Sequence, residues 1–144
     1  MAEAEIRKVG LFTIRENRVL LCRKKQGALI LPGGKREPGE SSLETLTREL
    51  REELGGEVRL LEPTSLGVYL DRTASHAAEA SKTIEIELYG GVLQGTPRAS
   101  NEIHTLIWFG AADPWQTLAP SLAGQIFPDL IRRGLLQWEK PCRF

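Results

Sequence analysis

The chain has 144 residues, of which 41% are hydrophobic and 26% are charged, a balance that predicts one self-folding domain over residues 1–144 and excludes a disordered chain. Lysine and arginine together number 19, as do aspartate and glutamate, so no general electrostatic attraction favours nucleic acid or an anionic membrane as a partner. An anionic ligand would therefore need a local binding site.

Two strands in a hairpin are predicted at the start of the chain. Residues 6–14 and 18–23 are rich in β-branched and apolar residues, and the polar stretch 15–17 between them indicates the turn. Residues 29–40, LILPGGKREPGE, then contain two prolines and three glycines, so we expect a loop without regular structure.

A helix follows and is the most clearly marked element. Ser41 stands three residues before Glu44, which is the spacing of a capping box, and Gly55-Gly56 marks the helix end. Leucines recur between them at helical intervals and predict the face that packs against the core. These residues are Leu43, Leu46, Leu50 and Leu54.

The rest of the chain predicts further strands and a second helix. Apolar or alternating segments predict strands at 57–61, 65–70, 82–93 and 104–109, and hence a mixed sheet. Residues 72–81 (RTASHAAEAS) form a loop of small residues that could border a substrate site. Residues 120–133 predict a helix that Pro128 restarts or kinks, because proline supplies no N–H to the preceding turn.

Cysteine usage and the N-terminal sequence bear on localisation. Cys22 and Cys142 are the only cysteines, which argues against a disulfide framework and favours a reduced compartment. Cys22 lies in an apolar run and is expected to be a core thiol. The N-terminal MAEAEIRK lacks the apolar stretch of a signal peptide, and no run has the roughly 18 apolar residues that span a bilayer. We expect a cytoplasmic protein without a membrane partner.

Three glutamates of the predicted helix form a candidate metal site. At about 100° per residue, Glu49, Glu52 and Glu53 share one arc beside the leucine face. Glu49 and Glu53 are a like-charge pair that destabilises a bare helix by roughly 0.2–0.5 kcal/mol. One interpretation is a solvated acidic face on which Arg48 pairs with Glu52 or Glu44. The other is a Mg²⁺ site, because the preceding Gly-Gly loop can bring carbonyl oxygens close to the same carboxylates.

The same segment resembles the signature of the Nudix hydrolases. Five residues separate Gly34 from Glu40, and seven separate Glu40 from Arg48-Glu49-Leu50. A single residue then separates Leu50 from Glu52-Glu53, and another separates Glu53 from Gly55. Every charged position of the signature is present. Gly56 stands where the family has an aliphatic residue, and we interpret this as a packing change. The resemblance implies an α/β fold, an α/β/α sandwich with a mixed β-sheet, in which the signature forms loop, helix and loop.

The resemblance also implies a metal shell and its supports. The implied ligands of Mg²⁺, or alternatively Mn²⁺, are the carbonyl of Gly33 and the carboxylates of Glu49, Glu52 and Glu53. Glu52 would otherwise orient a water, and Arg48 would hold a glutamate in place. Glu40 would be an outer or accessory metal carboxylate. The general base would be a helix glutamate or Glu102, where MutT-like members place an acidic residue; an inert exposed glutamate is the other interpretation of Glu102.

Basic and aromatic residues near the loop leave two interpretations each. Arg23, Lys24 and Lys35 flank the loop and are candidates for phosphate contacts, or are simply solvated at strand ends. Trp108 and Phe109 would stack on a base, or belong to the core.

The expected function is hydrolysis of a diphosphate linkage in a nucleoside-diphosphate-type substrate. Signals that mark other subfamilies outside the signature are missing, which favours a (d)NTP as substrate, with a nucleoside monophosphate and pyrophosphate as products. Ser121 stands where oxidised-guanine specialists carry an asparagine, so we expect broad base preference. The alternatives are an ADP-ribose, nucleotide-sugar or dinucleoside-polyphosphate pyrophosphatase and a catalytically silent nucleotide-binding sensor. The expected partner is a small nucleotide, without stable nucleic acid, and a homodimer is left open.

Overall fold

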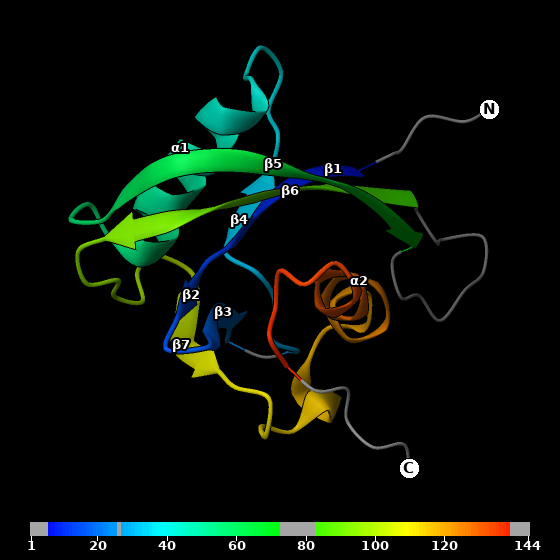
Figure 1. Ribbon diagram of the computed structural model, residues 1–144. Coiled ribbons are helices and arrows are strands. Elements are labelled where there is room, and N and C mark those ends of the chain that lie inside the picture. The colour runs from blue at the N-terminus through cyan, green and yellow to red at the C-terminus, as the bar shows by residue number, and fades with distance from the viewer. Residues whose placement is uncertain (1–5, 26, 73–82, 139–144) are drawn as a thin grey trace.

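The computed structural model describes residues 6–25, 27–72 and 83–138, and its centre consists of two β-sheets with helices on two sides (Figure 1). One sheet has the order β4-β1-β6-β5 and is mixed, because β1 runs parallel to β6 and the other pairs are antiparallel. The other, β2-β3-β7, is antiparallel. The strands are β1 (Ile6–Phe12), β2 (Ile14–Arg15), β3 (Arg18–Lys24), β4 (Gly33–Lys35), β5 (Arg59–Arg72), β6 (Thr83–Gln94) and β7 (Ile103–Phe109). The predicted mixed sheet and α/β class are confirmed.

The predicted first strand is split between the two sheets. The chain leaves the four-stranded sheet after β1, passes the buried Thr13, and enters the three-stranded sheet as β2. The predicted hairpin is present. Its two turn residues, Glu16 and Asn17, have φ of 52° and 62°, the left-handed conformation that matches the twist of a tight hairpin.

Helix α1 (Ser42–Leu54) begins and ends where the sequence predicts. The Ser41 hydroxyl accepts a hydrogen bond from the Glu44 backbone N–H, and the Glu44 carboxylate accepts one from the Ser41 N–H, so the capping box is formed. Three of the four predicted leucines are buried, whereas Leu43 is 40% exposed. The helix thus packs through Leu46, Leu50 and Leu54, together with strand residues Val9, Leu11, Leu20 and Leu93.

The glycine-rich segment contains a short strand that the sequence did not predict. Residues Gly33–Lys35 form β4, which pairs antiparallel with β1 at the edge of the sheet. Gly33 has φ 141°, and a Cβ there would overlap the carbonyl oxygen of Val9. Glycine is therefore needed for β4 to approach β1 so closely. The expectation of a loop without regular structure is wrong for these residues.

Two other expectations change in detail. The strands expected at 57–61 and 65–70 are one strand, β5, whose register shifts between Leu61 and Thr64 and between Ser65 and Gly67. The small-residue loop expected at 72–81 lies outside the described residues from 73 onward.

The predicted last helix contains a wider, π-helical segment. Leu122–Ile126 (η3) is π-helical and is followed by α2 (Phe127–Arg132), while a 3-10 turn, η2 (Trp115–Thr117), precedes both. The N–H of Phe127 donates to the carbonyl of Leu122, five residues back. Pro128 has no N–H to donate four residues back, and we attribute the wider turn to this loss. The expected irregularity at Pro128 is thus present.

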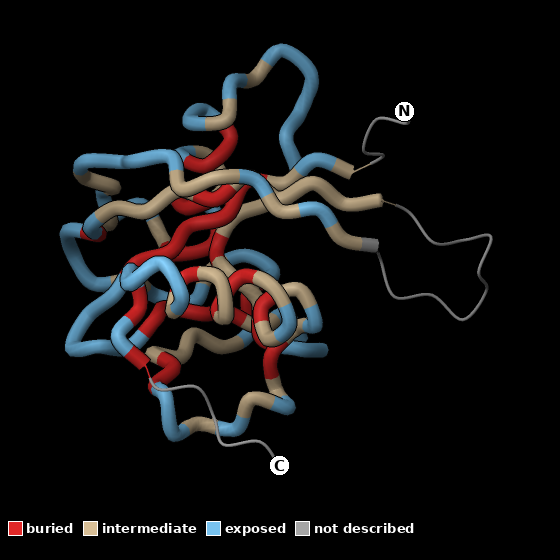
Figure 2. The backbone as a smooth tube through the Cα atoms, turned by 45° about the vertical axis from the view of Figure 1, so that its right-hand side comes forward, coloured by how far each residue is buried: buried red, intermediate tan, exposed pale blue. Residues whose placement is uncertain are grey.

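The buried residues form two clusters on opposite sides of the sheets, and Figure 2 shows them along the centre of the molecule. One cluster contains α1; the other contains η3 and α2, with Phe109, Phe127 and Trp138. Cys22 is fully buried, as expected of a core thiol, whereas Cys142 lies outside the described residues. Within the described segments, no helix has the length and apolar character needed to cross a membrane.

Candidate active site

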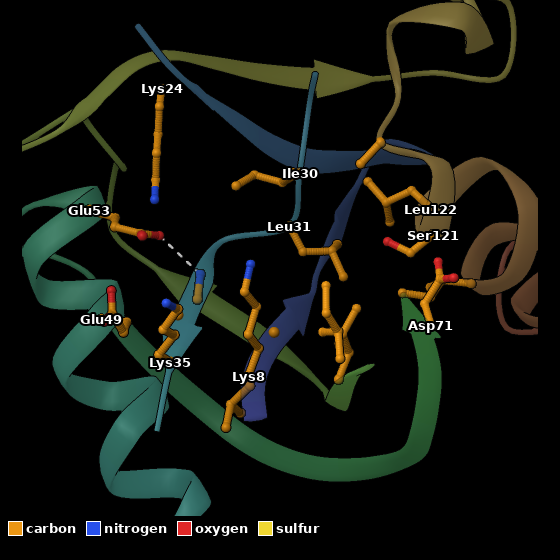
Figure 3. Close-up of a pocket in the computed structure, with 18 of the residues that line it drawn as sticks. Lys8, Lys24, Ile30, Leu31, Lys35, Glu49, Glu53, Asp71, Ser121 and Leu122 are labelled. Atoms are coloured by element: carbon orange, nitrogen blue, oxygen red, sulfur yellow. Dashed lines mark hydrogen bonds between the residues drawn. The ribbon is translucent and has the colours of Figure 1, made fainter. Parts of the chain in front are cut away.

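A pocket of about 570 Å³ lies between the C-terminal half of α1, the glycine segment and the start of η3 (Figure 3). This volume is typical of small-molecule sites, which span roughly 300–1,000 Å³. Six of the residues proposed from the sequence for metal, base or phosphate contacts line it: Gly33, Lys24, Lys35, Glu49, Glu53 and Glu102. Four others, Arg23, Glu40, Arg48 and Glu52, do not.

Glu49 and Glu53 lie one helical turn apart and face the glycine segment. Glu53 is only 2% exposed, and one of its carboxylate oxygens accepts a hydrogen bond of 2.9 Å from the N–H of Gly33. The side chain of Glu49 is 14% exposed, and a Cβ on Gly34 would overlap its carboxyl group. The Gly-Gly pair therefore lets the backbone lie directly against both carboxyl groups. A solvated acidic face, the other interpretation of the sequence, does not describe these two residues.

Burial shifts the pKa of both carboxyl groups upward. Burial raises the pKa of Glu53 to about 7; the Gly33 hydrogen bond opposes the shift and the nearby charge of Glu49 adds to it. Burial also raises the pKa of Glu49, and the hydrogen bond from Arg48 opposes that rise. Within the described part of the chain, no lysine or arginine forms an ion pair with Glu53. A cation held between these carboxylates would compensate their charge.

The donor set fits a hard divalent cation that keeps part of its shell open. Two carboxylates and the adjacent glycine backbone offer oxygen ligands only, as Mg²⁺ prefers. Among the described side chains, no three of His, Cys, Asp or Glu already surround one point. The protein would thus supply part of the shell, and water and ligand oxygens the remainder, which is the usual arrangement for Mg²⁺.

Arg48 connects the loop and the helix behind this acidic pair. It donates to Glu40 at 2.7 and 3.0 Å, to Glu49 at 3.0 Å and to the carbonyl of Lys35 at 3.2 Å. Its contact with Glu52 is longer, 3.4 Å. The hydrogen bond from Arg48 lowers the pKa of Glu40 to about 2 and so keeps it ionised. Arg48 thereby fixes the orientation of Glu49 without lining the pocket.

Glu40 and Glu52 differ from the acidic pair in their surroundings. Glu40 is engaged by Arg48 and by the hydroxyl of Thr45, and it does not line the pocket. Glu52 has a side chain that is 45% exposed. Glu102 lines the pocket from beyond the helix and forms an ion pair of 3.5 Å with Lys24.

Three lysines line the pocket near the acidic pair, namely Lys8, Lys24 and Lys35. Figure 3 shows their side chains directed into the space beside Glu53 and Glu49. Sequence reasoning singled out Lys24 and Lys35 but missed Lys8. Arg7 and Lys8 are both charged within β1, and no local pattern distinguishes Lys8 as a pocket residue. Arg23, the other basic candidate, is half-buried and not among the pocket residues.

The other end of the pocket is apolar and was not predicted. Its walls are formed by Ile30, Leu31, Ile84, Ile86, Leu122 and Ile126. Asp71 and Ser121 lie at its far side, opposite the glutamates (Figure 3). Neither Trp108 nor Phe109 lines the pocket: Phe109 is buried in the core, and Trp108 packs beside α1 with Arg15 over its ring at 5.1 Å. Both aromatic residues thus have packing roles here.

Known proteins share this architecture. The family model described as NUDIX domain matches residues 5–130. The 8-oxo-dGDP phosphatase NUDT18 of Mus musculus is 28% identical over 141 residues, covering 83% of this chain and 43% of that protein, so the chain spans less than half of this relative. The MutT NUDIX hydrolase of Burkholderia pseudomallei has 27% identity and a TM-score of 0.67, and the match covers 82% of this chain and 94% of that protein. The E. coli ORF135 protein has 26% identity and a TM-score of 0.64, and the match covers 96% of this chain and 94% of that protein.

Proposed function

The chain belongs to the Nudix hydrolase family, whose members act on phosphorus-containing anhydrides, and from this premise we propose that it hydrolyses a diphosphate linkage in a nucleotide with the help of a divalent cation. The single observation that supports this most is the composition of the pocket. Glu49, Glu53 and three lysines occupy one end and an apolar chamber the other. A nucleotide has the same division, with an anionic polyphosphate joined to a flat, largely apolar base.

The cation would be held by Glu49, Glu53 and the carbonyl of Gly33. When bound, Mg²⁺ or Mn²⁺ supplies charge neutralisation of the phosphates and activation of a water. Arg48 orients Glu49 through its hydrogen bond and so acts as a positioning residue. Glu52 contacts Arg48 and does not line the pocket, so it would have to turn inward to serve as a ligand or to orient a water.

Glu102 is our candidate for the general base. It lines the same pocket as the acidic pair, and Lys24 keeps its carboxylate on that side of the molecule. A base within reach of the attacking water contributes roughly 10²–10⁴-fold to such reactions. We therefore expect Glu102→Gln to lower kcat by at least about tenfold with little change in KM.

The proposed substrate is a (d)NTP, cleaved to a nucleoside monophosphate and pyrophosphate. A (d)NDP is the second candidate, because the mouse relative is named for a nucleoside diphosphate. Both would present the same α,β-diphosphate linkage to the acidic pair. We further propose that residues 1–144 form one domain and that the protein acts in the cytoplasm without a stable nucleic acid partner.

A substrate panel tests this function. dNTPs, dNDPs, ADP-ribose, UDP-glucose and diadenosine tetraphosphate are incubated with Mg²⁺. For dNTPs and dNDPs, phosphate is measured with and without added pyrophosphatase. The other three substrates have no terminal phosphate, so alkaline phosphatase is added, which releases phosphate only from their cleaved products. dNTPs should give phosphate only after pyrophosphatase is added, and Glu53→Gln should lower kcat by at least about a hundredfold. An ADP-ribose or dinucleotide preference of tenfold in kcat/KM would overturn the proposed substrate. Tight binding of nucleotides without turnover would instead identify a silent sensor.

A further inference from the structure

The floor of the pocket is formed by the four-stranded sheet, and the strand register fixes the order of its side chains. Lys8 on β1 pairs directly with Lys35 on β4 on one side and with Ile86 on β6 on the other. Two residues before Ile86 on β6, Ile84 pairs with Asp71 on β5. Directly paired residues point to the same face of a sheet. From β4 to β5 the floor therefore changes from two lysines to two isoleucines and then to an aspartate.

Lys8 occupies the boundary between the charged and apolar ends of this floor. It is half-buried, and within the described residues no carboxylate lies at ion-pair distance from its ammonium group. Burial, and then the charges of Lys24 and Lys35, lower its pKa, and only Glu53 counteracts them. Like charges directly opposite in a sheet are destabilising. The fold thus keeps a cation here at a cost in stability.

Lys24 and Lys35 are placed differently. Lys24 is already paired with Glu102, and Lys35 lies in the exposed edge strand β4. Lys8 pairs with Ile86, which lines the pocket, whereas the strand partner of Lys24, Ile103, does not line it. An anion bound by Lys8 would therefore be the one attached to whatever group fills the apolar chamber.

We propose that Lys8 binds the phosphoryl group attached to the nucleoside, and so sets the register of the polyphosphate chain relative to the acidic pair. This inference rests on the proposed function, because it takes the ligand to be a nucleotide. In this position Lys8 is a binding residue that contacts the substrate and the nucleoside monophosphate product alike. Equal contact with both states lowers KM and leaves kcat nearly unchanged.

The competing explanation is structural: the aliphatic part of Lys8 packs over the sheet while its ammonium reaches solvent. The two explanations differ in the expected stability of Lys8→Gln. If Lys8 is held at a cost for binding, its neutralisation leaves the melting temperature unchanged or raises it. If Lys8 supports the fold, the melting temperature falls.

Equilibrium binding without metal provides the test. GMP, AMP, CMP and UMP and the corresponding nucleosides are titrated calorimetrically into the wild type, Lys8→Gln, Lys8→Arg and the control Lys25→Gln. Lys25 is exposed and outside the pocket, so its variant controls for net charge. In Lys8→Gln, the affinity advantage of monophosphate over nucleoside should fall about tenfold while nucleoside affinity stays within about twofold. Lys8→Arg should retain most of the affinity advantage of monophosphate over nucleoside, and Lys25→Gln should retain all of it.

An unchanged advantage in Lys8→Gln, or no advantage in the wild type, would overturn the proposal. A lower melting temperature in both Lys8 variants would overturn it too, because it would show a structural role. The substrate panel tests the proposed function, and the binding ratios test the role of Lys8, so the two can fail independently. If the substrate panel shows no turnover, the binding ratios still report on Lys8; if the panel shows turnover and the ratios do not change, only the role of Lys8 is wrong.

Discussion

Glu53 is an ionisable side chain that the fold buries next to another carboxyl group, and its charge therefore depends on what surrounds it. The N–H of Gly33 donates a hydrogen bond of 2.9 Å to it, while the nearby charge of Glu49 disfavours its charged form. A protonated Glu53 suits the fold, whereas an ionised Glu53 suits a bound cation. The residue that we place at the centre of the chemistry is thus also a source of instability at neutral pH.

Glu53→Gln should change how the stability of the metal-free protein depends on pH. The pKa of Glu53 rises from 4.5 to about 7 on folding, so stability is greatest below about pH 4.5 and falls as the pH rises to about 7. At roughly 1.4 kcal/mol per pH unit, the loss reaches at most about 3 kcal/mol. Gln resembles the protonated acid, so the variant should match the wild type at pH 4.5 and exceed it at pH 8. Urea unfolding in EDTA measures this, and equal stability at pH 8 would contradict it.

Gly34→Ala tests the close approach of the backbone to the acidic pair. A Cβ at this position would overlap the carboxyl group of Glu49, so the substitution should displace that side chain. We expect kcat/KM to fall by at least about tenfold, because misplaced catalytic groups lose their orientation. Gly56→Ala is the matched control, since a Cβ there meets nothing within 4 Å. Equal activity of the two variants would show that the geometry around Gly34 is unimportant.

At the scale of elements, the sequence predicted those with strong local signals. The capping box, the leucine periodicity and the terminal glycine of α1 are all local, and they define this helix without tertiary information. Strand β4 exists only because β1 pairs with it, so its glycines indicated a loop. The π-helical η3 arises from the proline that follows it. Lys8 and Asp71 reach the site through the register of distant strands, and nothing local marks them.

Tyr69→Phe tests how β5 holds the helical wall of the pocket. The Tyr69 hydroxyl donates to Asp129 of α2 at 2.6 Å, and η3, which continues directly into α2, carries the wall residues Leu122 and Ile126. The lost hydrogen bond should lower the free energy of unfolding by about 1 kcal/mol and, by loosening the wall, raise KM about two- to fivefold. Tyr89→Phe is the control.

The Tyr89 hydroxyl donates to Glu87 at 3.1 Å, and neither residue lines the pocket. Its removal should lower stability similarly without changing KM. Urea unfolding and steady-state kinetics of the two variants give the comparison. A KM that rises equally in both would contradict the role assigned to the contact between β5 and α2.

At the scale of the whole molecule, the pocket joins two halves that have separate cores. Glu49 and Glu53 belong to α1, which packs in one buried cluster, whereas Leu122 and Ile126 belong to the other. The glycine segment lies between them and contributes Gly33 and Gly34 to the same pocket. A ligand that fills the pocket therefore contacts both halves. Ligand binding should accordingly stabilise the entire domain rather than one helix.

Stabilisation by Mg²⁺ should depend on pH through Glu53. Below about pH 7 the folded protein holds a proton on this carboxyl group, and a cation must displace it to bind. The affinity should therefore fall by up to about tenfold per pH unit between pH 7 and pH 5. Thermal unfolding with and without 5 mM Mg²⁺ should show a large rise in Tm at pH 8 and a small one at pH 5.5. Glu53→Gln should show a small rise at both pH values, because its amide cannot ionise. An equal rise at pH 5.5 and pH 8 in the wild type would mean that the cation binds elsewhere.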